Sequence, residues 1–427
     1  MSMQLDERKI NTGNSSWMRR FAKATIIALL QKMPKGRLEI QMPDGQCQTF
    51  GAGIDSFSPV AKIVVHSDEF FERCLLFGDL GLAEAYLDGL CDLHSIRSVI
   101  SWFLLNQDSV LLNESKTANA MFNLLGVLNK IGHALRDNSI AKSKTNIAEH
   151  YDLGNDFFKL FLDESMAYSS GLYTRDYSLH DAQLAKFERI AKELRIAPGD
   201  RVLDLGCGWG GLTCYLAQNF DCSLTALTIS QQQYDYTSKL IADLDLKHKI
   251  DLRLEDYRLH SGLYDKIVSI EMIEAVGEKY MDQFIQKVDS LLVRDGLLLM
   301  QMITSADSRY DVLRSNVDFI QKHIFPGSIL PSLYRVNTAM VKCGELFLVD
   351  LADLSNSYVR TLRAWQDNFV SHRAQLRAMG FDDRFMRKWL YYFEYCQAAF
   401  AMRNVSVVQA LYSRPNNPTL SHEWNNI

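Results

Sequence analysis

The stretch "VLDLGCGWGG", from Val202 to Gly211, decides the fold class. It starts as a short apolar strand, turns through closely spaced glycines and runs into the helical pattern "GLTCYLAQNF". Glycines let a backbone turn tightly and approach a ligand closely, and the N-terminus of a helix adds partial positive charge. Asp204 precedes the glycines, and no Lys-Ser/Thr pair follows them, which excludes a phosphate-cradling P-loop. The carboxylate suits a ligand with a cationic centre.

The sequence around this loop alternates between strand and helix patterns. Five strands are predicted, with helical segments such as "QQQYDYTSKLIADL" and Tyr280 to Leu292 between them; the strands are "RVLDLG", "CSLTALTIS", "IDLRLEDY", "YDKIVSIEM" and "GLLLMQMI". Such alternation predicts an α/β fold with a doubly wound, Rossmann-like parallel sheet and a ligand at the carboxyl ends of its strands. The C-terminal third is predicted to be helical and rich in aromatic residues.

The N-terminal part has a different sequence pattern. Residues 1–140 are predicted to form a small α+β domain, and residues 145–427 the main domain. Residues 17–32 read as an amphipathic helix, with Trp17 and Phe21 on its apolar face and Lys/Arg on another. Residues 1–35 carry seven Lys/Arg against two carboxylates. This helix is expected either to dock on an anionic lipid surface or to pack against its own domain.

Composition narrows the functional classes. The 427 residues are 47% hydrophobic, which indicates a folded chain with a sizeable core. The net charge of −5 argues against a nucleic-acid binder driven by bulk electrostatics. Eight cysteines occur without CxxC pairs, so neither a zinc site nor a disulfide framework is suggested, and a cytoplasmic location is expected. No apolar window approaches the length of a membrane span.

Several motifs together resemble one known family. The motif D-x-G-x-G-x-G at 204–210 resembles motif I of class I S-adenosylmethionine (SAM)-dependent methyltransferases. The wider set resembles the cyclopropane-fatty-acyl-phospholipid synthases, and it consists of "HYDLGNDFFKLFLDESMAYSSGLY" at 150–173, "EMIEAVGEKY" at 271–280, "FIQKHIFPGSILPSL" at 319–333 and "TLRAWQDNF" at 361–369. The similarity covers about 148–415, and "GDLGLAEAYLDG" at 78–89 extends it into the N-terminal domain, which in the longer synthases binds lipid.

The resemblance implies a SAM site. The glycine loop packs against the methionine part of the cofactor, and the end of the third strand contacts the adenine. Carried over by position, the cofactor residues are Tyr151, Tyr168, Ser169, Asp204, Gly206, Gly208, Gly210, Thr228, Ser230, Gln233, Asp256 and Tyr257. Core packing is the alternative interpretation for Tyr151 and Tyr168.

The implied reaction transfers a methyl group from SAM to a cis double bond in an acyl chain. The resulting carbocation must be kept from water and is stabilised by aromatic faces. A base then removes a proton so that the ring closes. In the family this base is thought to be bicarbonate, held by a Cys, a Glu, a His, a backbone amide and a Tyr. The matching positions here are Ser170, Glu274, Gln301, Ile303 and Tyr358.

The family pattern is not complete in this chain. Ser170 stands where Cys is usual, and Gln301 stands at the position of the common His. Both can still hydrogen-bond an oxyanion, but the identity of the base stays open. Loss of a proton from another carbon would give a methylene or methyl-branched product. Two further functional classes stay open, a non-catalytic lipid-binding homologue and a small-molecule or protein methyltransferase.

The resemblance also implies partners and a location. The substrate is an unsaturated phospholipid in a membrane surface, and the enzyme is expected to associate peripherally with the inner face of the cytoplasmic membrane. Family members can be dimers, so a homodimer is an open alternative.

Overall fold

The computed structural model describes residues 12–51, 59–111 and 153–420, with side chains described from residue 17 and not for 108–111. The chain divides into two compact units. Unit 1 takes residues up to 128 together with 383–391, and unit 2 takes 129–382 and 392–427. The predicted boundary between residues 140 and 145 lies outside the described residues.

Unit 1 is a small sheet with helices. Its elements are α1 (Thr12–Leu30), β1 (Arg37–Gln41), β2 (Cys47–Phe50), β3 (Val60–Val65), α2 (Glu69–Leu87), β4 (Cys91–Leu93) and α3 (Ile96–Leu111). The strand order is β2-β1-β3-β4, with β1 antiparallel to β2 and parallel to β3. β1 and β2 form a hairpin, because Pro43-Asp44-Gly45 between them favours a tight turn.

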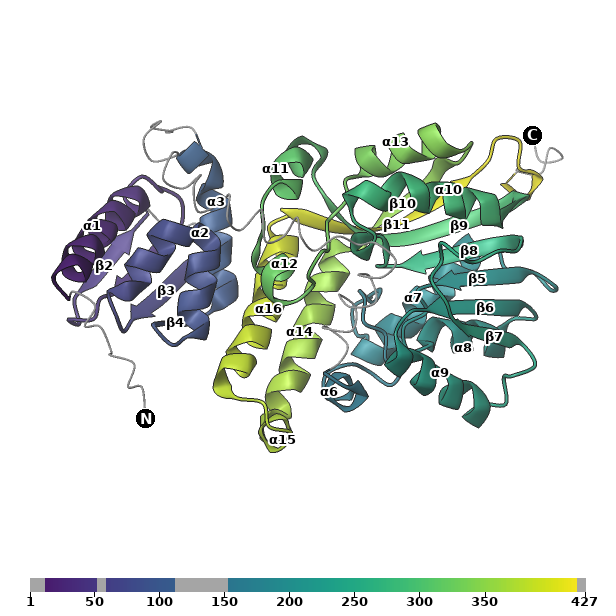
Figure 1. Cartoon of the computed structure of the whole chain (residues 1–427), viewed down its shortest axis with the longest axis horizontal. Coiled ribbons are helices and arrows are strands. Elements are labelled where there is room, and N and C mark those ends of the chain that lie inside the picture. Colours follow the sequence, from purple (N-terminus) through teal and green to yellow (C-terminus); the bar gives the residue numbers. More distant parts are fainter. Residues whose placement is uncertain (1–11, 52–58, 112–152, 421–427) are drawn as a thin grey trace, which may run out of the picture. The chain divides into compact units, whose positions relative to one another are not determined.

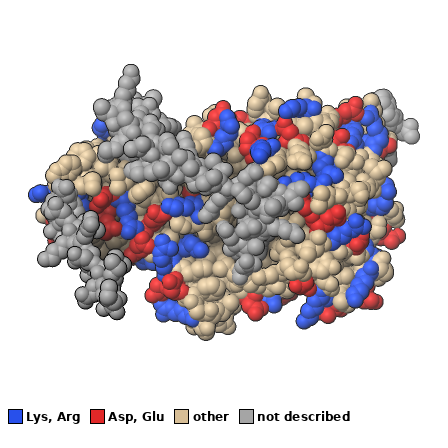
Figure 2. All heavy atoms as spheres, viewed as in Figure 1, with Lys and Arg blue, Asp and Glu red and all other residues tan. Residues whose placement is uncertain are grey.

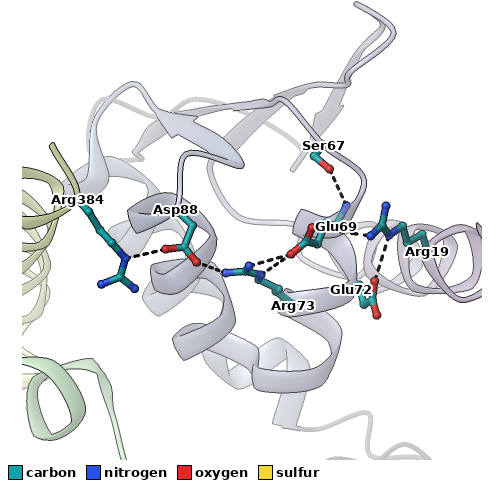
Figure 3. A network of polar contacts seen from close by, with 7 residues as sticks. All are labelled: Arg19, Ser67, Glu69, Glu72, Arg73, Asp88 and Arg384. Carbon is teal, nitrogen blue, oxygen red and sulfur yellow. Dashed lines mark hydrogen bonds and ion pairs between the residues drawn. The ribbon is translucent and has the colours of Figure 1, made fainter. Parts of the chain in front are cut away.

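Ion pairs connect the helices of unit 1 (Figure 3). Arg19 of α1 pairs with Glu69 and Glu72 at the start of α2. Arg73 pairs with Glu69 and with Asp88, and Asp88 also accepts a hydrogen bond from Arg384. The acidic first turn of α2 is favourable on its own because it faces the positive end of the helix dipole. Arg19 is the basic side chain that α1 contributes to this network.

Unit 2 contains a seven-stranded sheet in the order β10-β11-β9-β8-β5-β6-β7 (Figure 1). Its strands are β5 (Arg201–Leu205), β6 (Ser223–Thr228), β7 (Ile250–Leu254), β8 (Tyr264–Ile270), β9 (Leu292–Ser305), β10 (Phe347–Asp353) and β11 (Val405–Ser413). The five predicted strands are β5 to β9, and they pair in parallel. The predicted doubly wound α/β fold is confirmed.

Helices cover both faces of this sheet (Figure 1). The helices of unit 2 are α6 (Asn155–Lys159), α7 (Leu179–Glu193), α8 (Gly211–Asn219), α9 (Gln231–Asp243), α10 (Met281–Leu291), α11 (Tyr310–Arg314), α12 (Phe319–His323), α13 (Leu333–Cys343), α14 (Ser355–Ser371), α15 (Arg373–Ala378) and the part of α16 (Asp383–Ala401) from Tyr392 onward. α7, α8 and α9 share one core with Val202, and α10 and α13 share the other with Leu203 and Leu205. The alternation along β5 separates these cores because successive strand side chains point to opposite faces.

The expectation of an all-helical C-terminal third is wrong for two segments. β10 and β11 add an antiparallel edge beside β9. β11 is buried along almost its whole length, so it lacks the polar–apolar alternation that marks a half-exposed strand. A short apolar run of this kind cannot be distinguished from a buried helix until its partner strand is known.

Two further observations concern the surface. On the face drawn in Figure 2, the acidic and basic side chains of the described residues are interspersed. Among the residues that the structure describes, no helix is long and apolar enough to cross a membrane.

Candidate active site

The glycine loop joins β5 to α8. Gly206, Gly208 and Gly210 have φ angles of 83°, 58° and 82°, a region that favours glycine. A Cβ on Gly210 would lie 2.5 Å from Cγ2 of Thr237, and one on Gly206 would lie 2.8 Å from Cγ of Met272. A Cβ on Gly208 would meet no protein atom within 4 Å. The fold itself therefore needs glycine at 206 and 210, whereas open space lies beside Gly208.

Asp204 lies buried at the end of β5. Only 2% of its surface is exposed, and it accepts a hydrogen bond of 2.6 Å from Oγ1 of Thr213. Burial raises the pKa of Asp204 to about 6, against the lowering effects of the Thr213 hydrogen bond and the charge of Lys186. A carboxylate held in this way is available to a cationic or hydroxyl-bearing ligand at the loop.

The predicted residues after β6 form one hydrogen-bonded group. Oγ1 of Thr228 donates to Oε1 of Gln233 at 2.8 Å, and Ser230 caps α9 by accepting a bond of 3.4 Å from the Gln233 amide. The Ser230 amide donates to Thr228 at 3.2 Å. Because β6 lies beside β5, this group stands at the same carboxyl edge of the sheet as the glycine loop.

The two predicted residues after β7 differ from each other. The carboxylate of Asp256 is held by the Arg258 guanidinium, with a shortest contact of 2.6 Å. The Tyr257 hydroxyl is buried and has no hydrogen-bond partner among the described residues. Burial raises the pKa of Tyr257 to about 12, so the hydroxyl is neutral and able to donate. A buried, unpartnered hydroxyl at this edge is suited to a polar ligand.

The segment 153–173 packs directly on the glycine loop. Nε1 of Trp209 donates to Oδ1 of Asn155 at 2.7 Å, and the rings of Phe158 and Trp209 lie 4.9 Å apart. Tyr168 donates to the hydroxyl of Tyr392 at 3.1 Å. The Ser169 hydroxyl accepts a bond of 2.7 Å from Nζ of Lys186. Tyr151 lies outside the described residues.

Two glutamates follow β8. Glu274 lies in a short 3-10 turn, is 8% exposed, and accepts a bond of 2.5 Å at Oε1 from the Ile303 amide. Its Oε2 is buried and has no hydrogen-bond partner among the described residues. Burial, with a further contribution from the charge of Glu271, raises the pKa of Glu274 to about 8. Glu274 is therefore a buried acid that holds its proton near neutral pH.

Glu271 was not predicted as a site residue. Its carboxylate accepts hydrogen bonds from the Ser170 amide at 2.9 Å, from Nε2 of Gln301 at 2.7 Å and from the Tyr358 hydroxyl at 2.8 Å. The sequence contained one signal, since "IEMIEAVG" places a second glutamate one helical turn before Glu274. Three of the five predicted base-site residues, Ser170, Gln301 and Tyr358, donate to Glu271. The fourth, Ile303, donates its amide to the fifth, Glu274.

Other buried groups hold this cluster in place. Oε1 of Gln301 accepts a bond of 2.9 Å from Nε2 of Gln409. Lys186 is completely buried; its pKa is lowered to about 8 by burial, although the charges of Glu271, Asp163 and Asp204 raise it. Neither Gln409 nor Lys186 was predicted, because each comes from an element distant in sequence.

Aromatic rings surround the cluster. The ring of Tyr358 lies 4.6 Å from that of Phe400 and 6.0 Å from that of Trp365, and Trp365 lies 5.2 Å from Tyr168. These rings come from the segment 153–173, α14 and α16. They make a largely apolar environment whose faces attract positive charge. No cluster of three or more His, Cys, Asp or Glu suited to a metal occurs in the described part of the chain.

The fold and site together define a class I SAM-dependent methyltransferase. The residues present fit SAM, since the space beside Gly208, the buried Asp204 and the unpartnered Tyr257 hydroxyl stand at one edge of the sheet. A family profile described as mycolic acid cyclopropane synthetase matches residues 138–410, and the chain belongs to this family.

Individual relatives are consistent with this family membership. The chain is 34% identical over 377 residues to the cyclopropane-fatty-acyl-phospholipid synthase of Escherichia coli strain K12, covering 85% of this chain and 90% of that protein. It is 34% identical over 290 residues to the tuberculostearic acid methyltransferase of Mycobacterium tuberculosis, covering 66% and 68%. The crystal structure of a mycolic acid cyclopropane synthase with SAH and CTAB matches with a TM-score of 0.59 and 28% identity, over 64% of this chain and 98% of that one.

Proposed function

We propose that this protein transfers a methylene group from SAM to the cis double bond of an unsaturated phospholipid acyl chain, forming a cyclopropane ring. The observation that supports this most strongly is that Glu274, Gln301 and Tyr358 meet in one buried cluster of carboxylates beside the glycine loop. These residues come from separate elements, η1 (Ile273–Ala275), β9 and α14. The family membership and the relative of the same activity in Escherichia coli support the assignment.

In this proposal, SAM binds at the carboxyl edge of the sheet. Bound SAM supplies an electrophilic methyl group. In the proposal, Asp204 and the backbone of Gly206, Gly208 and Gly210 hold its amino-acid part, and Asp256 and Tyr257 its adenosine part. The remaining cofactor residues are Tyr151, Tyr168, Ser169, Thr228, Ser230 and Gln233. Arg258 holds the Asp256 carboxylate in an ion pair. In the proposal, Asp256 therefore contacts the cofactor while it stays paired with Arg258.

The protein's own groups handle the charge that develops on the substrate. The alkene is a weak nucleophile, so the cation that forms must be protected from water. The faces of Tyr168, Trp365 and Tyr358 offer cation–π stabilisation. Ser170, Glu274, Gln301, Ile303 and Tyr358 form the environment of the base that completes the reaction. Carboxylate chemistry is suited to this step, because a proton beside a carbocation is strongly acidic.

A methyl-branched or methylene product is the second candidate. Ser170 and Gln301 replace the Cys and His of the family pattern, and one relative at 34% identity is a tuberculostearic acid methyltransferase. Such a product arises from the same methyl transfer when the proton leaves from a neighbouring carbon.

We propose that the protein takes its lipid substrate from a membrane surface. On α1, Trp17 is 60% and Phe21 52% exposed, and Arg20 is exposed between them. Aromatic residues beside a cation suit the interface of an anionic bilayer. The proposed location is cytoplasmic, peripherally bound to the inner face of the cytoplasmic membrane, with a homodimer as one arrangement.

The test is incubation of the full chain with SAM and vesicles of a cis-unsaturated phospholipid, followed by release of the acyl chains. An added CH2 without a surviving alkene is expected for ring closure. An added CH2 with an alkene would favour the branched or methylene product. No addition over several lipids would favour a non-catalytic lipid-binding homologue or a different acceptor.

A further inference from the structure

The carboxylate of Glu271 accepts hydrogen bonds from residues at positions that the resemblance assigns to bicarbonate ligands. The Gln301 amide and the Tyr358 hydroxyl, which stand at two of the implied bicarbonate ligands, both donate to it. The Ser170 amide, which stands at a third implied ligand position, also donates to the Glu271 carboxylate. Three donors on one carboxylate is the arrangement expected for an oxyanion that must stay charged in a partly buried site.

A separate bicarbonate does not fit these residues. The Ile303 amide donates to Glu274, and the Ser170 hydroxyl donates to the carbonyl oxygen of Gly171. The donors that Ser170, Gln301, Ile303 and Tyr358 contribute are thus already used within the chain. A bound bicarbonate would also add a second negative charge beside Glu271, which like charges at close range oppose.

The backbone of Glu271 supports a functional reason for this residue. Its φ angle is 48°, in the left-handed region that side chains other than glycine rarely adopt. Its amide donates to the carbonyl oxygen of Gln301 at 2.7 Å, which anchors the turn to β9. A non-glycine residue kept in such a conformation next to a reaction site commonly has a role that compensates for the strain.

The groups around Glu271 and Glu274 favour one negative charge in this pair, located on Glu271. The pKa of Glu271 is raised overall by burial, although the hydrogen bonds from Gln301, Ser170 and Tyr358 and the charge of Lys186 oppose this shift. Among the described residues, the Ile303 amide donates to Glu274 whereas three groups from other residues donate to Glu271, so within the pair Glu271 is the better site for the negative charge. Glu271 as a residue is half-buried, whereas its three donor residues are buried.

Resting on the proposed function, we infer that Glu271 is the base, acting in place of bicarbonate. The alkene π electrons form the new C–CH3 bond as the methyl–sulfur bond breaks, leaving SAH and a carbocation. An oxygen of Glu271 takes a proton from the transferred methyl group. The electrons of that C–H bond close the ring, and Glu271 later returns the proton to solvent.

The experiment measures SAH release and the acyl product in buffer freed of carbon dioxide, with and without added bicarbonate. Wild-type turnover is expected to change less than about twofold, since the base is part of the chain. Glu271→Gln is expected to lose about 100-fold or more in turnover, with SAM binding retained, because a general base contributes on this order. Any residual product is expected to keep an alkene. The matched control is Glu188→Gln, an exposed glutamate on α7, with unchanged turnover.

Glu271→Gly gives an independent readout that a purely structural role would not produce. It removes the carboxylate, frees three donors and suits the positive φ. It is expected to be inactive without bicarbonate and to regain turnover when bicarbonate is added. The inference is overturned if wild-type ring formation depends on bicarbonate, or if either Glu271 variant keeps wild-type turnover in the bicarbonate-free buffer. Absence of ring product from the wild type would instead count against the proposed function.

Discussion

Gln409 on β11 and Gln301 on β9 are register partners, and the side-chain amide of Gln409 donates to Oε1 of Gln301 at 2.9 Å. This bond determines which way the Gln301 amide points, so that its Nε2 faces Glu271 and the Ser170 carbonyl oxygen. Arg189 in turn donates to Oε1 of Gln409 at 3.0 Å. A hydrogen-bonded row thus runs from a charged side chain to the carboxylate cluster.

Gln409→Glu should disturb this orientation with little change in size. The carboxylate has no N–H to donate, so Gln301 loses its partner or turns its own N–H away from Glu271. We expect kcat to fall about tenfold, equivalent to about 1.4 kcal/mol, with the KM for SAM unchanged. Steady-state kinetics test this split. An equal loss in SAM affinity would contradict a positioning role.

Glu274→Gln should reduce turnover sharply while sparing the cofactor. The change keeps the shape of the side chain but replaces the carboxyl group beside Glu271 with an amide that cannot ionise. A loss of about 100-fold in kcat is expected, with SAM affinity by calorimetry within about twofold of wild type. Normal turnover in this variant would remove Glu274 from the mechanism.

The same variant should change how stability depends on pH. The pKa of Glu274 is about 8 in the folded protein against an ordinary 4.5, so folding favours its protonated form. This contribution to the free energy of unfolding is complete below about pH 4.5 and is lost as pH rises through 8. Wild type should therefore lose up to about 4 kcal/mol relative to Glu274→Gln between pH 5 and 8. Denaturant unfolding at both pH values measures the difference, and parallel curves would contradict it.

Gly208→Ala and Gly199→Ala form a matched pair for the cofactor site. Both glycines have positive φ, 58° and 85°, and in both an added Cβ meets no protein atom within 4 Å. Each change should destabilise the fold by about 1 kcal/mol through backbone strain. Only Gly208→Ala should also weaken SAM binding, by about tenfold or more, since its methyl group enters the open space beside the loop. Equal affinities in the two variants would place SAM elsewhere.

Trp17→Ser with Phe21→Ser should weaken binding to anionic vesicles. Both side chains are more than half exposed on α1, and removing them deletes apolar area available to the bilayer interface. We expect at least about tenfold weaker binding in vesicle sedimentation. The control replaces Tyr334 and Val341 of α13, which are 71% and 80% exposed. An equal loss in both double variants would indicate nonspecific adsorption.

The sequence by itself determined the sheet and its ligand edge. The glycine spacing after Val202-Leu203-Asp204, together with alternating strand and helix patterns, sufficed because the physical causes are local: backbone freedom at glycine and burial of apolar strands. Family motifs then indicated Glu274 and Tyr358, which the structure places in one cluster with Ser170 and Gln301.

Only the tertiary structure decided where the charge and the protons lie. Glu271, Lys186 and Gln409 are separated by up to 223 positions in the sequence, and no local pattern links a lysine on α7 or a glutamine on β11 to a carboxylate after β8. Hydrogen-bond partners and pKa shifts arise from burial and from neighbours across the fold. The carboxylate that accepts three donors could therefore be recognised only once β9, β11 and α14 were seen around it.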